Sequence, residues 1–411
     1  MKTSIKESKI LKEVVNEFLK KRDEIGEEEI LVILRELNGI KNRNFIRNVS
    51  SYILTFSAKI VNIPFIEKTG DLIKNLITYV FLNYFEMDRE YLKKILDYFS
   101  RSSLNFCYFV DKYGIKEKEY KCEYLIACFL TVLVLPIGKI EDFKLWESIT
   151  KLWVLMDNMC DRREYMNWVK ESTIFFEERI WLDENKRKDF LKKKGNPIIE
   201  ILNEIELNKN NMKIYNRFYK LFLFSYKRDG YNKERNELDE KRMLKYSCLK
   251  ARKSLDIFQY SMDFERDEVN LKEYYARCLG IQLLDDLMDI KKDKEENGNT
   301  IFTKGNKKNN DRSAICVIKY LNEYNNKISE YLITLTVLFI HYNKEYFTDE
   351  FVEKIINNTE IIDLDNFNME KMMFLLKEDK FIEKFLKLFT GIREVKREME
   401  LNDIIYELRN C

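Results

Sequence analysis

Gln282-Leu-Leu-Asp285-Asp286-Leu-Met-Asp289-Ile-Lys-Lys-Asp293 closes an apolar helical run in the second half of the chain. Asp285, Asp289 and Asp293 are spaced four residues apart, so they line one edge of a helix over two turns. Gln282 lies one turn earlier, near the same face. Aspartate is a poor residue inside a helix, and like charges at this spacing repel one another. The stretch therefore predicts a helix whose carboxylates bind a ligand, while Asp286 is expected to point elsewhere, toward a basic partner.

A second acidic pair lies earlier in the chain, in Lys151-Leu-Trp-Val-Leu-Met-Asp157-Asn-Met-Cys-Asp161. Asp157 and Asp161 share one helix face because they are four residues apart, and Asn158 lies beside the first of them. A solvated acidic pair is the ordinary explanation for this spacing on its own. Two such clusters in one chain favour a different arrangement, in which facing helices of a bundle present two acidic edges across one cavity.

Carboxylates arranged in this way are typical ligands of Mg²⁺, which is commonly held by one or two carboxylates together with phosphate oxygens. The two edges can hold several Mg²⁺ ions around a diphosphate, where the metal stabilises negative charge on a leaving group. Cations must help as well. Arg252 and Lys253, one helix before the second cluster, are the candidates for gripping the diphosphate, with an ordinary solvated basic patch as the alternative. Arg162 and Arg163 are weaker candidates.

The composition indicates a helical protein. Only 11 Gly and 3 Pro occur in 411 residues, and 45% of the residues are hydrophobic, which favours long helices around a sizeable core. We expect an N-terminal helical region over residues 1–120, part of or packed on a bundle over residues 121–411. A single histidine, His341, argues against His-based triads and His-rich metal sites. Residues 294–312, rich in Asn, Gly and Lys, predict a long loop that can close over a ligand.

The charge distribution and hydropathy of the sequence limit the classes of partner that we expect. Basic and acidic residues are interspersed at a formal net charge of +2, so the sequence shows no electrostatic footprint for nucleic acid. The longest apolar run, residues 124–138, is shorter than the roughly 20 residues that span a bilayer. No signal peptide precedes the first amphipathic segment. We therefore expect a cytoplasmic protein without an integral membrane segment.

Paired aspartate-rich helices, with a QxxDDxxD pattern at Gln282–Asp289, resemble the all-α isoprenoid synthase superfamily. Its members include trans-prenyl diphosphate synthases, squalene and phytoene synthases, and class I terpene synthases. The resemblance covers roughly residue 124 to the C-terminus. It implies a bundle of long helices around a cavity, a Mg²⁺-bound diphosphate at the mouth, and ionisation of an all-trans prenyl diphosphate to a carbocation. It also implies Mg²⁺ binding and catalytic roles for Asp157, Asp161, Asp285 and Asp289, with Asp293 as a further metal ligand. Gln282, Asp286 and Asn158 would support them.

The motif details favour one branch of this superfamily. Gln282–Asp289 with Lys253-Ser254 resembles the chain-elongating enzymes, whose first motif usually has adjacent aspartates. Here Asn158 follows Asp157, so the first motif is more similar to that of large terpene synthases of the tetraprenyl-β-curcumene synthase type. A class I terpene synthase is the leading hypothesis. A trans-prenyltransferase and a non-catalytic helical scaffold remain alternatives, and a homodimer and a monomer both remain open.

Overall fold

The computed structural model describes residues 5–37, 88–115, 120–121, 124, 127–128, 140–159, 163–207, 212–221, 239–258, 260–261, 270–295, 298–324 and 329–359. The secondary structure of these residues is helical, and no β-strand occurs among them. This confirms the all-α class that the low glycine and proline content predicts.

The labelled α-helices are α1 (Ile5–Glu24), α2 (Glu27–Leu37), α5 (Arg89–Lys112), α7 (Phe143–Met159), α8 (Met166–Glu177), α9 (Glu184–Leu191), α10 (Pro197–Glu206), α12 (Glu240–Phe258), α13 (Leu271–Met288), α14 (Ile290–Glu295), α15 (Ile301–Lys304), α16 (Lys307–Tyr324), α17 (Ser329–Tyr342) and α18 (Asp349–Thr359). Short 3₁₀ turns are η1 (Arg163–Tyr165), η2 (Ile180–Leu182) and η3 (Lys344–Tyr346). Residues 212–221 form a further helix.

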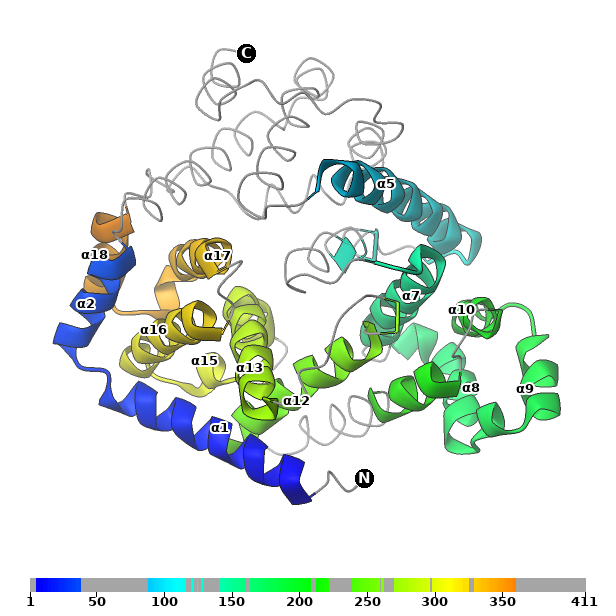
Figure 1. Cartoon of the computed structure of the whole chain (residues 1–411), viewed down its shortest axis with the longest axis horizontal. Helices are drawn as coiled ribbons and strands as arrows, with labels where there is room; N and C mark the ends of the chain where they lie inside the picture. Colours follow the sequence, from blue (N-terminus) through cyan, green and yellow to red (C-terminus); the bar gives the residue numbers. More distant parts are fainter. Residues whose placement is uncertain are drawn as a thin grey trace, which may run out of the picture.

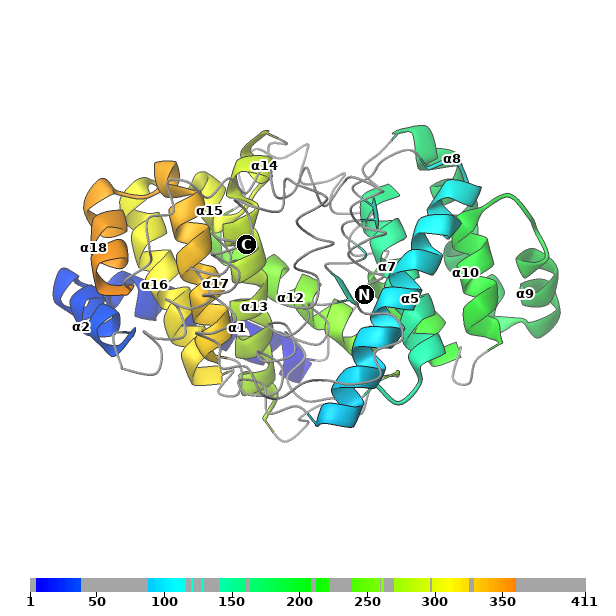
Figure 2. The same cartoon turned by 90° about the horizontal axis from the view of Figure 1, so that it is seen from above.

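The described helices pack around two apolar cores, which lie on opposite sides of the molecule in Figures 1 and 2. The first core is built by α1, α2 and α13–α18. The second is built by α5, α7–α10 and the helix at residues 212–221. Helix α12 belongs to both, because Leu244 and Cys248 lie in the first core while Ile257 and Phe258 lie in the second.

The N-terminal residues are divided between these cores. Helices α1 and α2 are part of the first core, whereas α5 packs into the second. Within residues 1–120, the described helices are thus integrated with the rest of the chain and form no separate core of their own. The described helices of residues 1–120 therefore contribute side chains to both cores.

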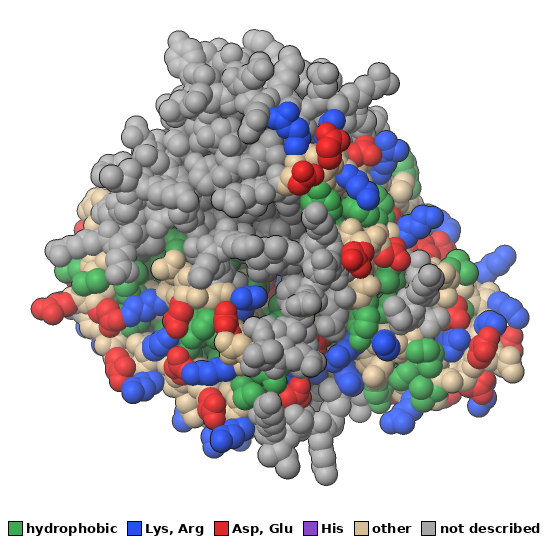
Figure 3. Space-filling view, viewed as in Figure 1, with side chains coloured by type: hydrophobic (Ala, Val, Ile, Leu, Met, Phe, Trp, Pro, Cys, Tyr) green, Lys and Arg blue, Asp and Glu red, His purple; other side chains and the backbone are tan. Residues whose placement is uncertain are grey.

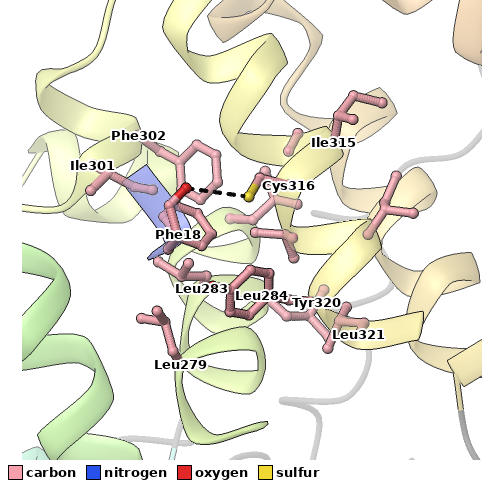
Figure 4. Close-up of a cluster of buried hydrophobic side chains, with 14 of the residues drawn as sticks. Phe18, Leu279, Leu283, Leu284, Ile301, Phe302, Ile315, Cys316, Tyr320 and Leu321 are labelled. Atoms are coloured by element: carbon pink, nitrogen blue, oxygen red, sulfur yellow. Dashed lines mark hydrogen bonds between the residues drawn. The ribbon is translucent and has the colours of Figure 1, made fainter. Parts of the chain in front are cut away.

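Helix α1 is fixed to the first core by large buried side chains (Figure 4). The Phe18 ring packs edge-to-face on Tyr320 of α16, with 5.2 Å between the ring centroids. Leu279 and Leu283 of α13 are fully buried in the same cluster. Burial of each such side chain stabilises the fold by about 1.5–3 kcal/mol, so α1 is an integral element of this half of the protein.

Residues 294–312 differ from the long loop that their composition predicts. Most of them lie in helices, because α14 continues to Glu295, α15 covers Ile301–Lys304 and α16 begins at Lys307. The Thr300 and Thr303 side chains form a capping box at the start of α15. The Asn306 side chain accepts a 2.9 Å hydrogen bond from the backbone N–H of Asn309. The loop prediction was wrong because these Thr and Asn residues cap helices, which turn-favouring composition alone does not distinguish.

Two further observations bear on the surface. On the described part of the face in Figure 3, basic and acidic side chains alternate without a large patch of one sign. Among the described helices, none is both long enough and apolar enough to cross a lipid bilayer.

Candidate functional site

Asp285, Asp289 and Asp293, which we call the aspartate ladder, lie where α13 gives way to α14. Asp289 is the C-cap of α13, so the ladder is not carried by one uninterrupted helix. The four-residue spacing survives this break because the backbone hydrogen bonds continue across it. The N–H of Asp289 donates to the carbonyl of Asp285 (3.1 Å), and that of Asp293 donates to the carbonyl of Asp289 (2.8 Å).

The ladder holds negative charge at an energetic cost. Burial, together with the neighbouring charges of Asp285 and Asp293, raises the pKa of Asp289 to about 7. Burial, followed by the charges of Asp286 and Asp285, raises the pKa of Asp293 to about 7 as well. Carboxyl groups with such pKa values bind protons near neutral pH unless a cation compensates their charge. The ladder is therefore a set of oxygen donors poised for a cation.

Asp286 anchors the ladder to α12. Its carboxylate accepts a 2.9 Å hydrogen bond from the Ser247 hydroxyl and a 3.2 Å bond from Gln282 Nε2. The same amide nitrogen donates to Asp285 at 2.7 Å. Burial and the charge of Asp285 raise the pKa of Asp286 to about 7. The structure thus brings Gln282, Asp285 and Asp286 together, but the hydrogen-bond donors to Asp286 are an amide and a hydroxyl in place of the basic group expected from the sequence.

Lys250 is the cation of α12 that acts on this cluster. Its charge lowers the pKa values of Asp286, Asp289 and Asp293, in opposition to burial. Lys250 follows Ser247 by three residues, so the two share one face of α12. Lys250 was not among the cations predicted from the sequence, which were Arg252 and Lys253 on the same helix. The i, i+3 spacing from a polar residue on the same helix is the signal that could have found it.

Arg252 lies on another face of α12 and is bound by other partners. Its Nη2 donates to Glu7 of α1 at 2.8 Å, and its Nη1 donates to the hydroxyl of Tyr275, whose ring it also overlies. Its Nε lies 3.6 Å from Asp256. The structure therefore places Arg252 in a buried network between α1, α12 and α13, and it does not bring this guanidinium to the ladder.

The environment of Lys253 differs from those of Lys250 and Arg252. Burial lowers its pKa to about 8, and the strongest charges acting on it are those of Arg252, Asp256, Lys220 and Arg217. These groups gather around the C-terminal half of α12. Of the two diphosphate-binding candidates from the sequence, neither is placed among the ladder carboxylates.

The first acidic pair is only partly described. Asp157 and Asn158 lie in the last turns of α7, but their side chains, like Asp161 and Arg162 altogether, fall outside the described residues. Figure 2 shows α8, which follows α7, and α14, which follows α13, along the same edge of the molecule. The C-terminal ends of α7 and α13 therefore point to one side. Whether Asp157 and Asp161 face the ladder stays a prediction.

The ladder fits Mg²⁺ by the chemistry of its donors. Among the described residues, no group of three or more His, Cys, Asp and Glu side chains is arranged as a ready-made metal cage. A Mg²⁺ ion that is shared with phosphate oxygens needs only one or two carboxylates, because water and phosphate fill its other positions. Half-buried carboxylates with pKa values near 7 are suitable ligands of this kind.

No protein-family model matches the chain, and neither a curated protein nor a solved structure matches it.

The segment after the ladder packs closely on it. The N–H of Gly298 donates to the carbonyl of Asp293 at 2.5 Å. A Cβ at position 298 would lie 3.1 Å from that carbonyl and 3.1 Å from the Asp293 Cβ. The hydroxyl of Thr303 donates to the Gly298 carbonyl at 2.8 Å. Glycine at this position lets the chain turn back against the last carboxylate of the ladder, which fixes the position of Asp293.

Proposed function

We propose that this chain is a Mg²⁺-dependent class I terpene synthase, with the helical bundle of the isoprenoid synthases, which ionises an all-trans prenyl diphosphate and releases diphosphate. The observation that carries the proposal is the aspartate ladder at the end of α13, whose last two pKa values are raised to about 7. The two carboxylates held at this cost favour a cationic ligand, and the QxxDDxxD pattern that contains Asp285 and Asp289 resembles a diphosphate-binding motif.

Each residue of the site has a separate role in this proposal. Asp285, Asp289 and Asp293 would bind Mg²⁺ through their carboxylate oxygens. Bound Mg²⁺ supplies Lewis acidity, which stabilises the charge that the diphosphate gains as its bond to carbon breaks. Gln282 keeps the Asp285 carboxylate oriented through its 2.7 Å hydrogen bond. Lys250 contributes positive charge that acts on Asp286, Asp289 and Asp293.

Apolar packing holds the helices that carry the ladder. Leu283 and Leu287 are fully buried on α13, and Ile290 is fully buried at the start of α14. These side chains fix the helices that carry the ladder in the first core. A rigid donor set binds a metal–diphosphate complex with less loss of conformational entropy.

The decisive experiment is an incubation of the purified protein with Mg²⁺ and all-trans prenyl diphosphates of increasing length, with and without isopentenyl diphosphate. Extracted products are identified by mass spectrometry. We expect a hydrocarbon or alcohol from a single substrate, lost on chelation and in Asp289→Asn. The matched control is Asp189→Asn, since Asp189 is 76% exposed on α9, far from the ladder in sequence.

Other outcomes separate the alternatives. Longer diphosphates that appear only with isopentenyl diphosphate would identify a chain-elongating trans-prenyltransferase. A condensed product from two prenyl diphosphates would identify the squalene-synthase-like branch. No product from any substrate, together with no effect of Mg²⁺ and diphosphate on the melting temperature, would leave a non-catalytic helical scaffold.

A further inference from the structure

The segment between α17 and α18 contacts the helices that carry the aspartate ladder. We call this segment, residues 343–348, the α17–α18 connection. It begins with Asn343, which is only 1% exposed, and continues through η3. The backbone N–H of Asn343 donates to the carbonyl of Phe339 at 2.9 Å, so the backbone of this residue is still bound to the last turn of α17. The Asn343 side chain therefore starts from a fixed point.

The Asn343 side chain reaches the end of α13. Its Nδ2 donates to the Leu287 carbonyl at 2.8 Å and to the Met288 carbonyl at 3.4 Å. These two residues are the last of α13, and the last four carbonyls of an α-helix have no partner within the helix. Since carbonyl oxygens only accept hydrogen bonds, the amide must turn its NH₂ group toward both of them. Asn343 thus caps α13 from another helix.

Leu287 and Met288 lie directly before the break in the ladder. At Asp289, with φ of −96° and ψ of 13°, the chain leaves the regular helical conformation. The dihedral angles of this residue decide the direction in which α14 leaves α13, and with it the position of Asp293 relative to Asp285. The Met288 carbonyl belongs to the peptide unit that enters Asp289. A donor fixed on that carbonyl therefore restricts the angle at the break.

The α17–α18 connection is itself anchored to α16. Asn310, which is 2% exposed, donates through Nδ2 to the Tyr346 carbonyl at 3.0 Å and to the Phe302 carbonyl of α15 at 3.1 Å. The Asp311 carboxylate accepts a 3.1 Å hydrogen bond from the N–H of Thr348 and a 2.6 Å bond from its hydroxyl. The connection is therefore a fixed support for the amide that caps α13.

A further contact of the connection reaches α14. The ammonium group of Lys294 lies over the Tyr346 ring, 4.3 Å from its centroid. Lys294 directly follows Asp293, the last carboxylate of the ladder. The connection thus contacts the chain on both sides of the break, through Asn343 before it and through Tyr346 after it. An element that contacts both helices can set the angle between them.

We propose that Asn343 is a positioning residue for the aspartate ladder, and that its amide sets the affinity of the ladder for Mg²⁺ by fixing the break at Asp289. The inference rests on the proposed function, because it takes Mg²⁺ with diphosphate as the ligand of the ladder. Mg²⁺ demands near-octahedral geometry at about 2.0–2.1 Å. Without this amide, the Leu287 and Met288 carbonyls turn toward water, and the carboxylates beyond the break move out of that geometry.

Asn343→Leu tests the inference in the full-length protein, since leucine has a similar volume and no hydrogen-bond donor. Calorimetric titration with the Mg²⁺–diphosphate complex, at a temperature where the variant is folded, measures the affinity of folded molecules alone. We expect the complex to bind Asn343→Leu about tenfold more weakly than the wild type, because groups that hold metal ligands in place have effects of this size when they are removed.

Asn196→Leu is the matched control. Asn196 is 2% exposed, and its Nδ2 donates to the Trp168 carbonyl of α8 at 3.1 Å. Both substitutions remove a buried amide that donates to a backbone carbonyl, so both should lower the melting temperature. Only Asn343→Leu should weaken binding of the complex. A purely structural role of Asn343 would leave the affinity of the folded molecules as high in this variant as in the control.

Hydrogen exchange of the wild type gives a readout that needs no variant. Coupling between two sites is reciprocal, so binding of the complex at the ladder should also slow exchange in the connection. The N–H groups of Tyr346 and Phe347, which donate to the carbonyls of Asn343 and Lys344, report this change. Exchange in α9 should stay the same.

The inference is overturned if folded Asn343→Leu binds the complex as tightly as the wild type does. Should that variant fail to fold, exchange that slows at the ladder but not in the connection overturns it. A wild type that does not bind the Mg²⁺–diphosphate complex refutes the proposed function, and this inference with it. Binding by the wild type therefore separates a failure of the inference from a failure of the function.

Discussion

The hydroxyl of Ser247 on α12 donates a 2.9 Å hydrogen bond to the carboxylate of Asp286 on α13. Both residues are buried, so this bond joins the two helices beside the aspartate ladder with little competition from water. It also sets the position of Lys250, which lies one turn further along the same face of α12. The charge balance of the ladder thus depends on the contact between α12 and α13, and substitutions on either helix can test it.

Magnesium with inorganic diphosphate should stabilise the wild-type protein. A ligand that binds only the folded state raises its stability by mass action, by about 2.7 kcal/mol at a hundredfold excess over Kd. We expect a higher melting temperature with both components and much less with diphosphate alone in EDTA. Asp289→Asn should lose the increment, and Asp189→Asn should keep it. An equal increment in Asp289→Asn would remove the ladder from the proposed function.

Without metal, the protein should become less stable as the pH rises from about 5.5 to 8. The pKa values of Asp286, Asp289 and Asp293 are raised from 3.8 to about 7 in the folded state. The folded protein therefore holds more protons than the unfolded chain between those values, and its advantage is lost as the pH passes through 7. Denaturant titrations across this range measure the slope.

Replacing one ladder residue should flatten that pH dependence. Asp289→Asn removes a group whose charge is costly, so the free energy of unfolding at pH 8 should rise relative to the wild type, while the difference at pH 5.5 should be small. Asp189→Asn, at an exposed position, should follow the wild-type curve. A wild-type curve that is flat or rises between pH 5.5 and 8 would contradict the electrostatic account of the ladder.

Ser247→Ala should lower the free energy of unfolding by about 1–3 kcal/mol, the usual cost of leaving a buried polar group without its hydrogen bond. The Ser247 hydroxyl lowers the pKa of Asp286, so its loss should also shift the pH dependence described above to higher pH. Ser247→Thr retains a hydroxyl and serves as the control. Identical stability curves for wild type and Ser247→Ala would show that this contact contributes nothing.

Lys250→Met should weaken binding of the Mg²⁺–diphosphate complex about tenfold, or about 1.4 kcal/mol, since it removes the α12 cation that acts on the ladder. The control is Lys188→Met, whose lysine is 56% exposed on α9. Calorimetric titration of both variants decides the matter. If Lys253→Met weakens this complex while Lys250→Met does not, the cation at the diphosphate is Lys253, as the sequence suggested.

Arg252→Met should act mainly on stability. Removing one partner of a buried ion pair costs about 3–5 kcal/mol, and here both Glu7 and Asp256 lose a cation. The stabilising increment from Mg²⁺ and diphosphate should survive in this variant, measured at a temperature where it is folded. Loss of the increment at unchanged stability would instead place Arg252 at the diphosphate.

The helical class and the ladder spacing could be predicted from local pattern, because both follow from periodicity along one segment. The cation that acts on the ladder could not be predicted in this way. Lys250 and Arg252 are two residues apart and both cationic. Only the packing of α12 between α1 and α13 decides that Lys250 acts on Asp286 while Arg252 binds Glu7. The role of Ser247 was hidden for the same reason, since its partner lies on the next helix.

The division into two cores was also beyond sequence analysis. Helical periodicity identifies the apolar face of α1, but not which of many apolar faces it will meet. Its ion pairs join residues far apart in the chain, such as Lys21 with Glu323. Composition misjudged residues 294–312 because the same Asn and Thr residues that favour loops also cap helices.

Helix α1, with α2, completes a core whose other described members lie between residues 243 and 355. During synthesis α1 leaves the ribosome before these partners, which emerge more than 200 residues later. The second core, between residues 89 and 258, can close earlier, so Phe18 and its apolar neighbours must wait, exposed, while another part of the protein folds. Helix α1 is therefore made early and buried late, and it is the segment for which a molecular chaperone would matter most.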